Sequence, residues 1–342
     1  MLKNDRLLRA ARRQPVDRTP VWFMRQAGRY QPEYRQVRQK HTLMEIVRHP
    51  DVCAEVTLLP VQQLDVDAAI LFSDIMVPVE AMGVVLEIRE GTGPVIAQPI
   101  RTMEQVEALR PVVAEESLPH VLKTIRLLVG ELEVPLLGFA GAPFTLASYL
   151  VEGGPSRHYV KVKQMMYGSP DLWNALMDKL SAMVGDYLVA QVRAGCQAVQ
   201  IFDSWVGQLS LRDYQRFVAP HMVRIAARVA ESGAPVIHFG VGTGHLLPAM
   251  AQVGGDVVGA DWREPIDQAW GRIGPDRGVQ GNLDPVTLFA PPEALEAEAR
   301  DILQRVAGRP GHIFNLGHGV LPETPVDALK RVVDVVHAFD PS

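Results

Sequence analysis

The stretch Ala68-Ala69-Ile70-Leu71-Phe72-Ser73-Asp74 shows the pattern from which the fold of this chain follows. Its five apolar residues suit a strand buried on both faces, and the run ends abruptly at a hydroxyl and a carboxylate. A segment of helical periodicity, from Thr42 to Gln63, precedes it. Strands buried on both faces are typical of parallel sheets, whose neighbouring strands need helical crossovers.

Seven further short runs of the same kind are separated by long helical segments. The strands predicted in this way are Pro20 to Met24, Ala68 to Phe72, Pro135 to Phe139, Ala198 to Phe202, Pro235 to Phe239, Asp256 to Ala260, Val279 to Gly281, and His312 to Asn315. The helices predicted between or beside them include Thr42 to Gln63, Leu172 to Arg193, Arg212 to Glu231, Pro292 to Val306, and Val326 to Ala338. Eight such units favour an α/β fold closed into a (β/α)₈ TIM barrel.

The domain organisation is predicted to be simple. No linker or low-complexity tract divides the chain, so residues 1–342 are expected to form a single domain. The first fourteen residues predict an N-terminal helical extension that packs through Leu2, Leu7 and Leu8. The longest interruption, from Pro78 to Val134, predicts a small hairpin followed by a helix from Thr102.

Composition limits the classes of function. The chain has 47% hydrophobic residues, 21% charged residues and a net charge of −5, which argues against a general nucleic-acid binder. It contains no run of about 18 apolar residues, so no membrane span is expected and a cytoplasmic location is the default. Cys53 and Cys196 lie far apart and are expected to be reduced core residues rather than a zinc site or a disulfide.

One segment of this acidic chain is basic. Between Val21 and Pro50 there are six basic residues and two acidic ones, a local excess of +4 that suggests a small anionic ligand. Within it, Arg25 and Arg29 directly follow the first predicted strand, and arginine forks bind carboxylates through two parallel hydrogen bonds. Gly28 permits a close approach of the backbone. The alternative is a solvated helix face carrying surface salt bridges.

In a barrel of this type the active site lies at the carboxyl ends of the strands. The residues expected there are Arg25, Ser73, Asp74, Ala140, Gly141, Tyr149, Asp203, Ser204, Gly240, Asp261, Asn282, Gly317 and His318. Asp74 would emerge from the barrel core, although a helix cap is an equally good reading of it by itself. His318 lies between two glycines, so a purely structural role in a turn is an alternative for it.

Two other patterns are weaker. The string from His238 to Gly244 superficially suggests a phosphate loop, but it lacks the lysine and hydroxyl of a P-loop, so a tight turn is preferred. The pairs His238 with His245 and His312 with His318 are seven and six residues apart. Neither spacing matches a metal-binding pair on one helical face, so no metal site is predicted.

Five motifs, in this order, resemble the uroporphyrinogen decarboxylase family over nearly the whole chain. They are Pro20-Val21-Trp22-Phe23-Met24-Arg25-Gln26-Ala27-Gly28-Arg29-Tyr30 with Pro32-Glu33-Tyr34-Arg35, then Phe72-Ser73-Asp74-Ile75, Ser148-Tyr149-Leu150-Val151-Glu152-Gly153-Gly154, Phe202-Asp203-Ser204, and Asn315-Leu316-Gly317-His318-Gly319. The first motif is long and specific. The others gain weight from their positions at the ends of predicted strands.

The resemblance implies a single barrel, usually a homodimer, that needs neither metal nor organic cofactor. It implies conversion of the four acetate groups of uroporphyrinogen III to methyls in porphyrin biosynthesis, giving coproporphyrinogen III and four molecules of carbon dioxide. The substrate-binding residues carried over are Arg25, Gln26, Ala27, Gly28, Arg29, Asp74, Tyr149, Ser204 and His318. Asp74, Arg25 and Arg29 are the candidates for catalysis, with Asp74 facing the pyrrole nitrogens.

Two alternatives belong to other functional classes. Cobalamin-linked methyltransferases of the same barrel superfamily carry a His-x-Cys zinc element, whereas this chain reads His238-Phe239-Gly240 at that place. A noncatalytic tetrapyrrole binder would need the arginines but not Asp74. The sequence disfavours the first and leaves the second to be tested with substrate.

Overall fold

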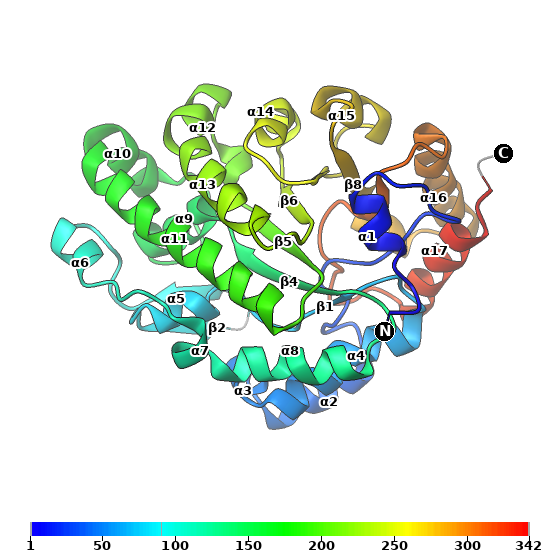
Figure 1. Cartoon of the computed structure of the whole chain (residues 1–342), viewed down its shortest axis with the longest axis horizontal. Coiled ribbons are helices and arrows are strands. Elements are labelled where there is room, and N and C mark those ends of the chain that lie inside the picture. Colours follow the sequence, from blue (N-terminus) through cyan, green and yellow to red (C-terminus); the bar gives the residue numbers. More distant parts are fainter. Residues whose placement is uncertain (1, 90, 341–342) are drawn as a thin grey trace.

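A curled sheet of seven parallel strands forms the centre of the protein, for which a computed structural model describes residues 2–89 and 91–340 (Figure 1). The strands in spatial order are β1 (Ala69–Ile70), β4 (Leu136–Gly141), β5 (Ala198–Asp203), β6 (Val236–Gly240), β7 (Val257–Gly259), β8 (Gly278–Leu283) and β9 (His312–Leu316). Every neighbouring pair in this sheet is parallel. Seven of the eight predicted strands are therefore confirmed in place, and the α/β class with them.

The eighth position is occupied by an extended segment rather than by a strand. Val21 pairs with Phe314 of β9 in a single parallel bridge. On its other side, the carbonyl oxygen of Val21 accepts a hydrogen bond of 2.8 Å from the backbone N–H of Asp67, just before β1. This segment thus joins the two edges of the curled sheet, which closes the barrel.

The prediction of a strand from Pro20 to Met24 is wrong in extent, and side chains explain why. The backbone N–H of Val21 donates to the buried carboxylate of Asp67, and that of Met24 donates to Asn315. The N–H of Phe23 is likewise taken by the side chain of Gln26. Backbone donors that are used in this way cannot form a ladder, so pairing is confined to one bridge.

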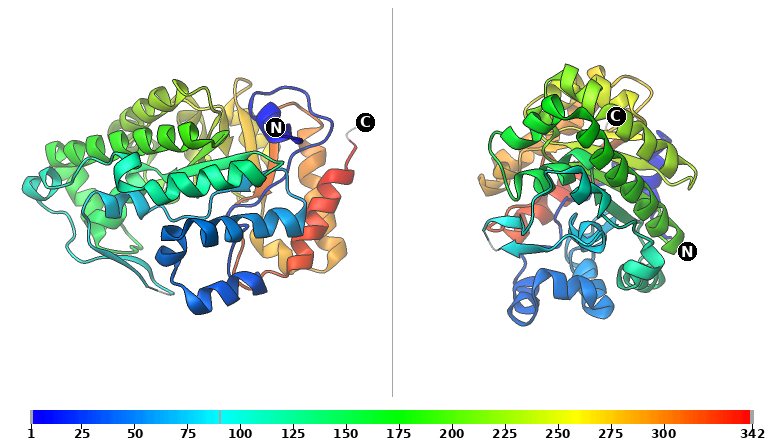
Figure 2. Two further views of the ribbon diagram at one scale, coloured as in Figure 1. Left: turned by 60° about the horizontal axis from the view of Figure 1, so that its bottom comes forward. Right: turned by 90° about the vertical axis from the view of Figure 1, so that its left-hand side faces the viewer.

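Helices cover the outside of the sheet, as Figures 1 and 2 show. The α-helices are α1 (Arg6–Ala11), α2 (Pro32–Lys40), α3 (Leu43–Arg48), α4 (Pro50–Leu64), α5 (Val77–Ala81), α6 (Met103–Glu107), α7 (Ala114–Ser117), α8 (Pro119–Glu131), α9 (Pro143–Glu152), α10 (Val160–Gly168), α11 (Pro170–Ala194), α12 (Leu211–Phe217), α13 (Ala219–Ala230), α14 (Leu247–Gln252), α15 (Ile266–Ile273), α16 (Pro292–Val306) and α17 (Val326–Ala338). Three 3₁₀ turns complete the elements: η1 (Val206–Gln208), η2 (Gly244–Leu246) and η3 (Pro285–Phe289). The predicted helices Leu172 to Arg193, Pro292 to Val306 and Val326 to Ala338 are confirmed by α11, α16 and α17.

Two predicted helices are each divided in two. The segment from Thr42 to Gln63 breaks at His49 (φ −109°, ψ 95°), because Pro50 disfavours helical geometry in the residue before it. The segment from Arg212 to Glu231 breaks at Val218 (φ −126°, ψ −49°), and Pro220 lies in the first turn of α13, where its missing N–H costs nothing. Both predictions therefore identified the helical region but missed a proline boundary.

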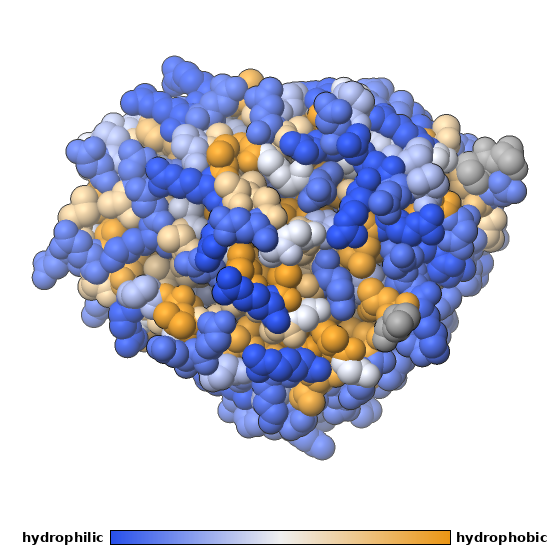
Figure 3. All heavy atoms as spheres, in the orientation of Figure 1, coloured by the Kyte–Doolittle hydropathy of each residue, from blue (hydrophilic) through white to orange (hydrophobic). Residues whose placement is uncertain are grey.

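The N-terminal helix and the hairpin lie at opposite ends of the barrel. Helix α1 buries Leu7, and the backbone N–H of Lys3 bonds to Glu133, which precedes β4, so α1 covers the amino-terminal ends of the strands. It lies on the viewer's side of Figure 1, and Figure 3 shows that hydrophilic residues cover most of this face. Strands β2 (Leu86–Arg89) and β3 (Gly93–Ile96) form the predicted antiparallel hairpin. Thr102 then caps helix α6 with a capping box, which agrees with the predicted helix start.

Both cysteines are free and buried, as the sequence predicts. Burial raises the pKa of the Cys53 thiol to about 12 and that of Cys196 still further, so neither is a ready nucleophile. Within residues 2–89 and 91–340, no helix combines the length and the apolar composition that a membrane crossing requires.

Candidate active site

A cavity of about 960 Å³ lies at the carboxyl ends of the strands. The hairpin β2–β3 forms part of its wall. This volume is at the upper end of the range for small-molecule sites, so the cavity can hold a large ligand. Eight of the nine residues predicted to bind substrate line it, namely Arg25, Ala27, Gly28, Arg29, Asp74, Tyr149, Ser204 and His318. Residues spread over 294 positions of the chain thus meet at one site.

The side chain of Arg25 reaches into the cavity from a left-handed backbone conformation (φ 61°). Such a conformation costs a residue with a side chain on the order of 1–3 kcal/mol, so surrounding contacts must hold it. Tyr30 donates a hydrogen bond of 2.6 Å to the carbonyl oxygen of Gln26, and Gly28 donates its N–H to Gln31. The turn that carries Arg25 and Arg29 is therefore fixed from behind, while both guanidinium groups stay open to the cavity.

Gln26 does not line the cavity, although the resemblance included it among the substrate-binding residues. Its side chain is fully buried behind the turn, where Oε1 accepts from the N–H of Phe23 and Nε2 donates to the carbonyl of Ala68. Its own N–H bonds to the carbonyl of Phe23. All of these groups are occupied within the protein, so Gln26 ties the arginine turn to β1.

Asp74 follows β1 and lines the cavity. Its Oδ1 accepts a hydrogen bond of 2.8 Å from the N–H of Met76, which leaves the other oxygen open toward the cavity. Protein surrounds the carboxyl group, although solvent still reaches it through the cavity. Burial raises its pKa, while the bond from Met76 and the charge of Arg25 oppose that rise. The group can stabilise a cation that comes close to it.

Tyr149 and Ser204 are held together by a buried contact between α9 and the end of β5. Thr145, one helical turn before Tyr149, donates a hydrogen bond of 3.0 Å to Asp203 and accepts one of 3.2 Å from the N–H of Trp205. The rings of Tyr149 and Trp205 pack edge to face with centroids 5.9 Å apart. Burial raises the pKa of Tyr149, so its hydroxyl stays protonated and can donate to a carboxylate.

His318 follows β9 and packs edge to face against Trp262, with ring centroids 6.4 Å apart. Burial lowers its pKa, and the nearby charge of Arg25 lowers it further. A neutral imidazole at neutral pH follows from this, with one nitrogen able to donate and the other able to accept. A Cβ at Gly317 would lie 2.5 Å from the backbone nitrogen of Trp262, so the glycine permits this close packing.

The cavity also contains residues that the sequence did not single out. Apolar rings form part of its lining, and those of Phe139 and Phe202 meet edge to face at 5.4 Å. Arg38 and Arg48 reach it as well, and their signal in the sequence was the basic excess between Val21 and Pro50. The aromatic residues carried no comparable signal, because an apolar residue at the end of a buried strand is ordinary in any barrel.

The residues described by the structure contain no group of three or more His, Cys, Asp or Glu side chains arranged to hold a metal ion. Two of the histidines considered for such a role contact backbone carbonyls, His245 that of Leu209 at 2.7 Å and His312 that of Gly281 at 3.0 Å. The glycine-rich string begins within β6 and continues into a turn in which Gly242 has a φ of 68°.

Comparisons with known proteins find similar proteins along nearly the whole chain. The family model described as "Uroporphyrinogen decarboxylase (URO-D)" matches residues 2–339. Proteins named uroporphyrinogen decarboxylase from Sorangium cellulosum and Thermus thermophilus are each 56% identical to this chain; the alignments cover 98% of it and 97% and 98% of those proteins. A solved methyltransferase structure from Methanosarcina mazei has a TM-score of 0.78 at 22% identity, covering 97% of each chain. That structural likeness supports the fold and nothing further.

Proposed function

The chain belongs to the uroporphyrinogen decarboxylase family, and from this premise we propose that the cavity at the carboxyl ends of its strands is the site of decarboxylation. The reaction converts the four acetate groups of uroporphyrinogen III to methyls, giving coproporphyrinogen III and four molecules of carbon dioxide. The observation that carries the assignment of the site is the meeting of Asp74 with Arg25, Arg29, Tyr149 and His318 in one cavity.

The chemistry needs a place for the electron pair left by carbon dioxide, a task for which many decarboxylases recruit a cofactor. Here the pyrrole can serve. A proton added to the ring carbon that bears the acetate makes an iminium-like cation, and cleavage of the C–C bond returns the pair to the ring system. A second proton then converts the exocyclic methylene to methyl as the ring proton leaves. Each acetate therefore consumes one proton and releases one carbon dioxide.

We assign to Asp74 the stabilisation of that cation. A porphyrinogen has saturated bridges between its rings, so it can dome and direct several N–H groups at one carboxylate. Those donors, together with Arg25, would favour the ionised form of Asp74 and offset the effect of burial on its pKa. A preorganised anion in a largely enclosed site is among the strongest electrostatic contributions to catalysis.

Arg25 and Arg29 are assigned to the carboxylates of the substrate. Each charge-assisted hydrogen bond to a charged group contributes about 1.5–3 kcal/mol. The hydroxyls of Tyr149 and Ser204 and the imidazole of His318 line the same cavity and can orient further carboxylates. Arginine's very high pKa argues against its acting as a free acid, so a water held by Arg25 and Arg29 is the better proton donor.

We also propose that residues 1–342 form one domain that acts as a homodimer in the cytoplasm without binding nucleic acid. The continuous buried apolar cluster, which runs from Leu7 to Val336, supports one domain. The free cysteines suit a reducing compartment, and the net charge of −5 supports the exclusion of nucleic acid. Sedimentation of the purified chain would test the dimer.

The decisive experiment is anaerobic incubation with uroporphyrinogen III, followed by a count of carboxyl groups in the product. We expect successive loss of four carboxyls. Unchanged substrate that is nevertheless bound would identify a noncatalytic tetrapyrrole binder. The methyltransferase alternative is not favoured, because Gly240 stands where that reaction's zinc site needs a cysteine and Cys196 is buried elsewhere.

A further inference from the structure

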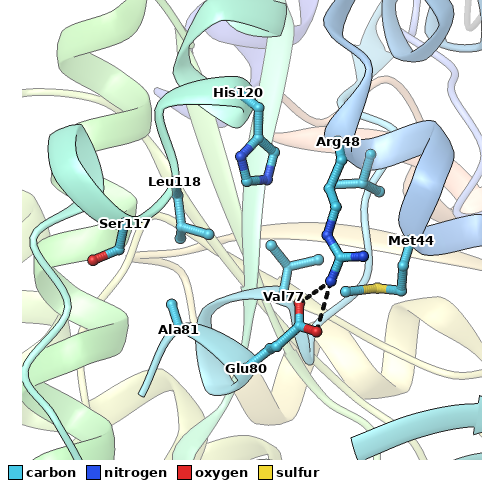
Figure 4. A pocket seen from close by; sticks show the side chains of 9 residues that line it. Met44, Arg48, Val77, Glu80, Ala81, Ser117, Leu118 and His120 are labelled. Carbon is cyan, nitrogen blue, oxygen red and sulfur yellow. Dashed lines mark hydrogen bonds and ion pairs between the residues drawn. The ribbon is translucent and has the colours of Figure 1, made fainter. Parts of the chain in front are cut away.

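A second, smaller pocket of about 140 Å³ lies beside the main cavity, between α3, α5 and the start of α8 (Figure 4). Its wall is largely apolar, with Val77, Ala81 and Leu118 among the lining residues. His120, Arg48 and Glu80 are the ionisable residues among those that line it. The decarboxylation outlined above uses none of these side chains.

The ion pair of Arg48 and Glu80 stands between the two spaces. Nη2 of Arg48 lies 2.7 Å from Oε1 and 2.8 Å from Oε2 of Glu80, and Figure 4 shows the two side chains meeting at the edge of the small pocket. Both residues, together with Met44, line the main cavity as well as the small pocket. Arg48 therefore faces the ligand cavity but holds a carboxylate of the protein itself.

The ion pair of Arg48 and Glu80 is weak enough for a substrate carboxylate to replace Glu80. Its side chains are 49% and 37% exposed, and ion pairs of that exposure contribute about 0–1 kcal/mol. Uroporphyrinogen III carries four acetate and four propionate groups, so it supplies many carboxylates that compete for Arg48 at high local concentration. Replacing one carboxylate by another keeps the arginine paired, provided that the displaced side chain has somewhere to go.

The small pocket provides that space. Glu80 already lines it, and so does His120. Burial lowers the pKa of His120 and the charge of Arg48 lowers it further, whereas Glu80 raises it. If Glu80 moves from Arg48 toward His120, it keeps a hydrogen-bonding partner instead of becoming a buried unpaired charge.

We propose that Arg48 is a further substrate-binding residue that binds a peripheral carboxylate of the tetrapyrrole. In the free protein the carboxylate of Glu80 occupies the position of that substrate group, and it moves into the small pocket when substrate binds. The proposal rests on the proposed function, because it assigns a subsite of the same cavity. It predicts that removing Arg48 weakens substrate binding, whereas removing Glu80 does not.

The test compares Arg48→Gln with Glu80→Gln in steady-state assays with uroporphyrinogen III. Arg48→Gln should raise KM by about 10-fold or more and change kcat little, since a uniformly used contact is lost. Glu80→Gln should leave KM unchanged or lower it by up to about fivefold, because Arg48 no longer has to be released. The double variant should resemble Arg48→Gln.

A merely structural ion pair would behave differently, since removing either partner would then raise KM alike. Such parallel shifts, or an unchanged KM in Arg48→Gln, would overturn the proposal. Should Arg48→Gln fail to fold, Arg48→Lys is the second variant, and it should raise KM less because the charge is kept. Loss of product formation by the unaltered protein would instead count against the proposed function itself.

The matched control is the pair of Arg331 and Glu296 on α17 and α16. Its side chains are 45% and 31% exposed and lie 2.9 Å apart, but neither lines the cavity. Arg331→Gln and Glu296→Gln should leave KM unchanged.

Filling the small pocket with Ala81→Leu tests the second half of the proposal. It should raise KM in the unaltered background and much less in a Glu80→Ala background. Equal effects in both would refute the movement of Glu80.

Discussion

The side chain of Arg25 passes directly over Gly319. A Cβ at position 319 would lie 2.5 Å from Cδ and 2.7 Å from Cγ of Arg25, closer than such atoms approach in proteins. The loop after β9 thus leaves room for the side chain of Arg25, which comes from the segment before β1. Because Arg25 also has a left-handed backbone, both its backbone and the aliphatic part of its side chain are confined.

Gly319→Ala should therefore reduce activity by displacing Arg25. Position 319 has no positive φ, so alanine fits the backbone there and the clash falls on the arginine side chain. We expect kcat/KM to fall by about 10-fold or more, the order of one charged hydrogen bond. Gly130→Ala on α8, where a Cβ meets nothing within 4 Å, is the control and should be silent. Equal activities of the two variants would show that Arg25 is free to move.

Asp74→Asn should lower kcat by at least about 10²-fold, as expected for the loss of one preorganised electrostatic group. The amide oxygen can still accept from Met76, so the local turn survives. Asp284 makes the same type of contact, accepting at 2.9 Å from the N–H of Val286, but lies outside the cavity. Asp284→Asn is thus the matched control. Near-normal turnover by Asp74→Asn would remove Asp74 from the mechanism.

The same substitution should stabilise the protein at neutral pH. Burial raises the pKa of Asp74 above its usual 3.8, so the folded state binds this proton more tightly than the unfolded state does. The charged form of Asp74 therefore lowers the free energy of unfolding. This loss grows as pH rises from about 3.8 through the higher folded pKa and reaches its full size above that pKa. Urea unfolding of both proteins across this range should show Asp74→Asn gaining relative stability with rising pH. A constant difference would contradict the raised pKa.

Arg29→Lys should raise KM more than it lowers kcat. Lysine keeps the charge but loses the two-pronged geometry that suits a carboxylate, and a contact used equally in the ground and transition states affects KM alone. Steady-state kinetics would measure both constants, with the exposed Arg126→Lys on α8 as the control. A larger effect on kcat would assign Arg29 to the chemical step.

Asp67→Asn should weaken the closure of the barrel. The buried carboxylate accepts hydrogen bonds from Asn4, from the N–H of Val21 and from His337, and so joins the N-terminal segment to α17. We expect a loss of about 2–4 kcal/mol in the free energy of unfolding at pH 7. Asp65→Asn, whose side chain is 88% exposed, should change it little. An unchanged free energy of unfolding in Asp67→Asn would show that the charge at position 67 is dispensable.

Acid should act on the same carboxylate. Burial opposes ionisation of Asp67, but the hydrogen bonds from His337, Asn4 and Val21 outweigh it and lower the pKa below 3.8. Its stabilisation is therefore present above about 3.8 and is lost as pH falls through the lower folded pKa.

The sequence by itself determined the alternation of strands and helices and the residues at the strand ends. Both are local properties: a buried strand is a short apolar run, and the residue after it must emerge at the rim. Asp74, Ser204 and His318 could be placed in one cavity on that basis, because closing the barrel brings every strand end to the same face, whereas Tyr149 on α9 was selected by the resemblance.

Only the tertiary structure decided how the barrel closes and which side chains near the site are already paired with groups of the protein. Val21 pairs through one bridge because Asp67 and other side chains take its segment's backbone donors, and the bond from His337 to Asp67 spans 270 positions. The side chain of Gln26 points inward and binds backbone groups, whereas Arg48 faces the cavity and is paired with Glu80. Contacts between side chains distant in the sequence leave no periodic pattern, so packing alone settles them.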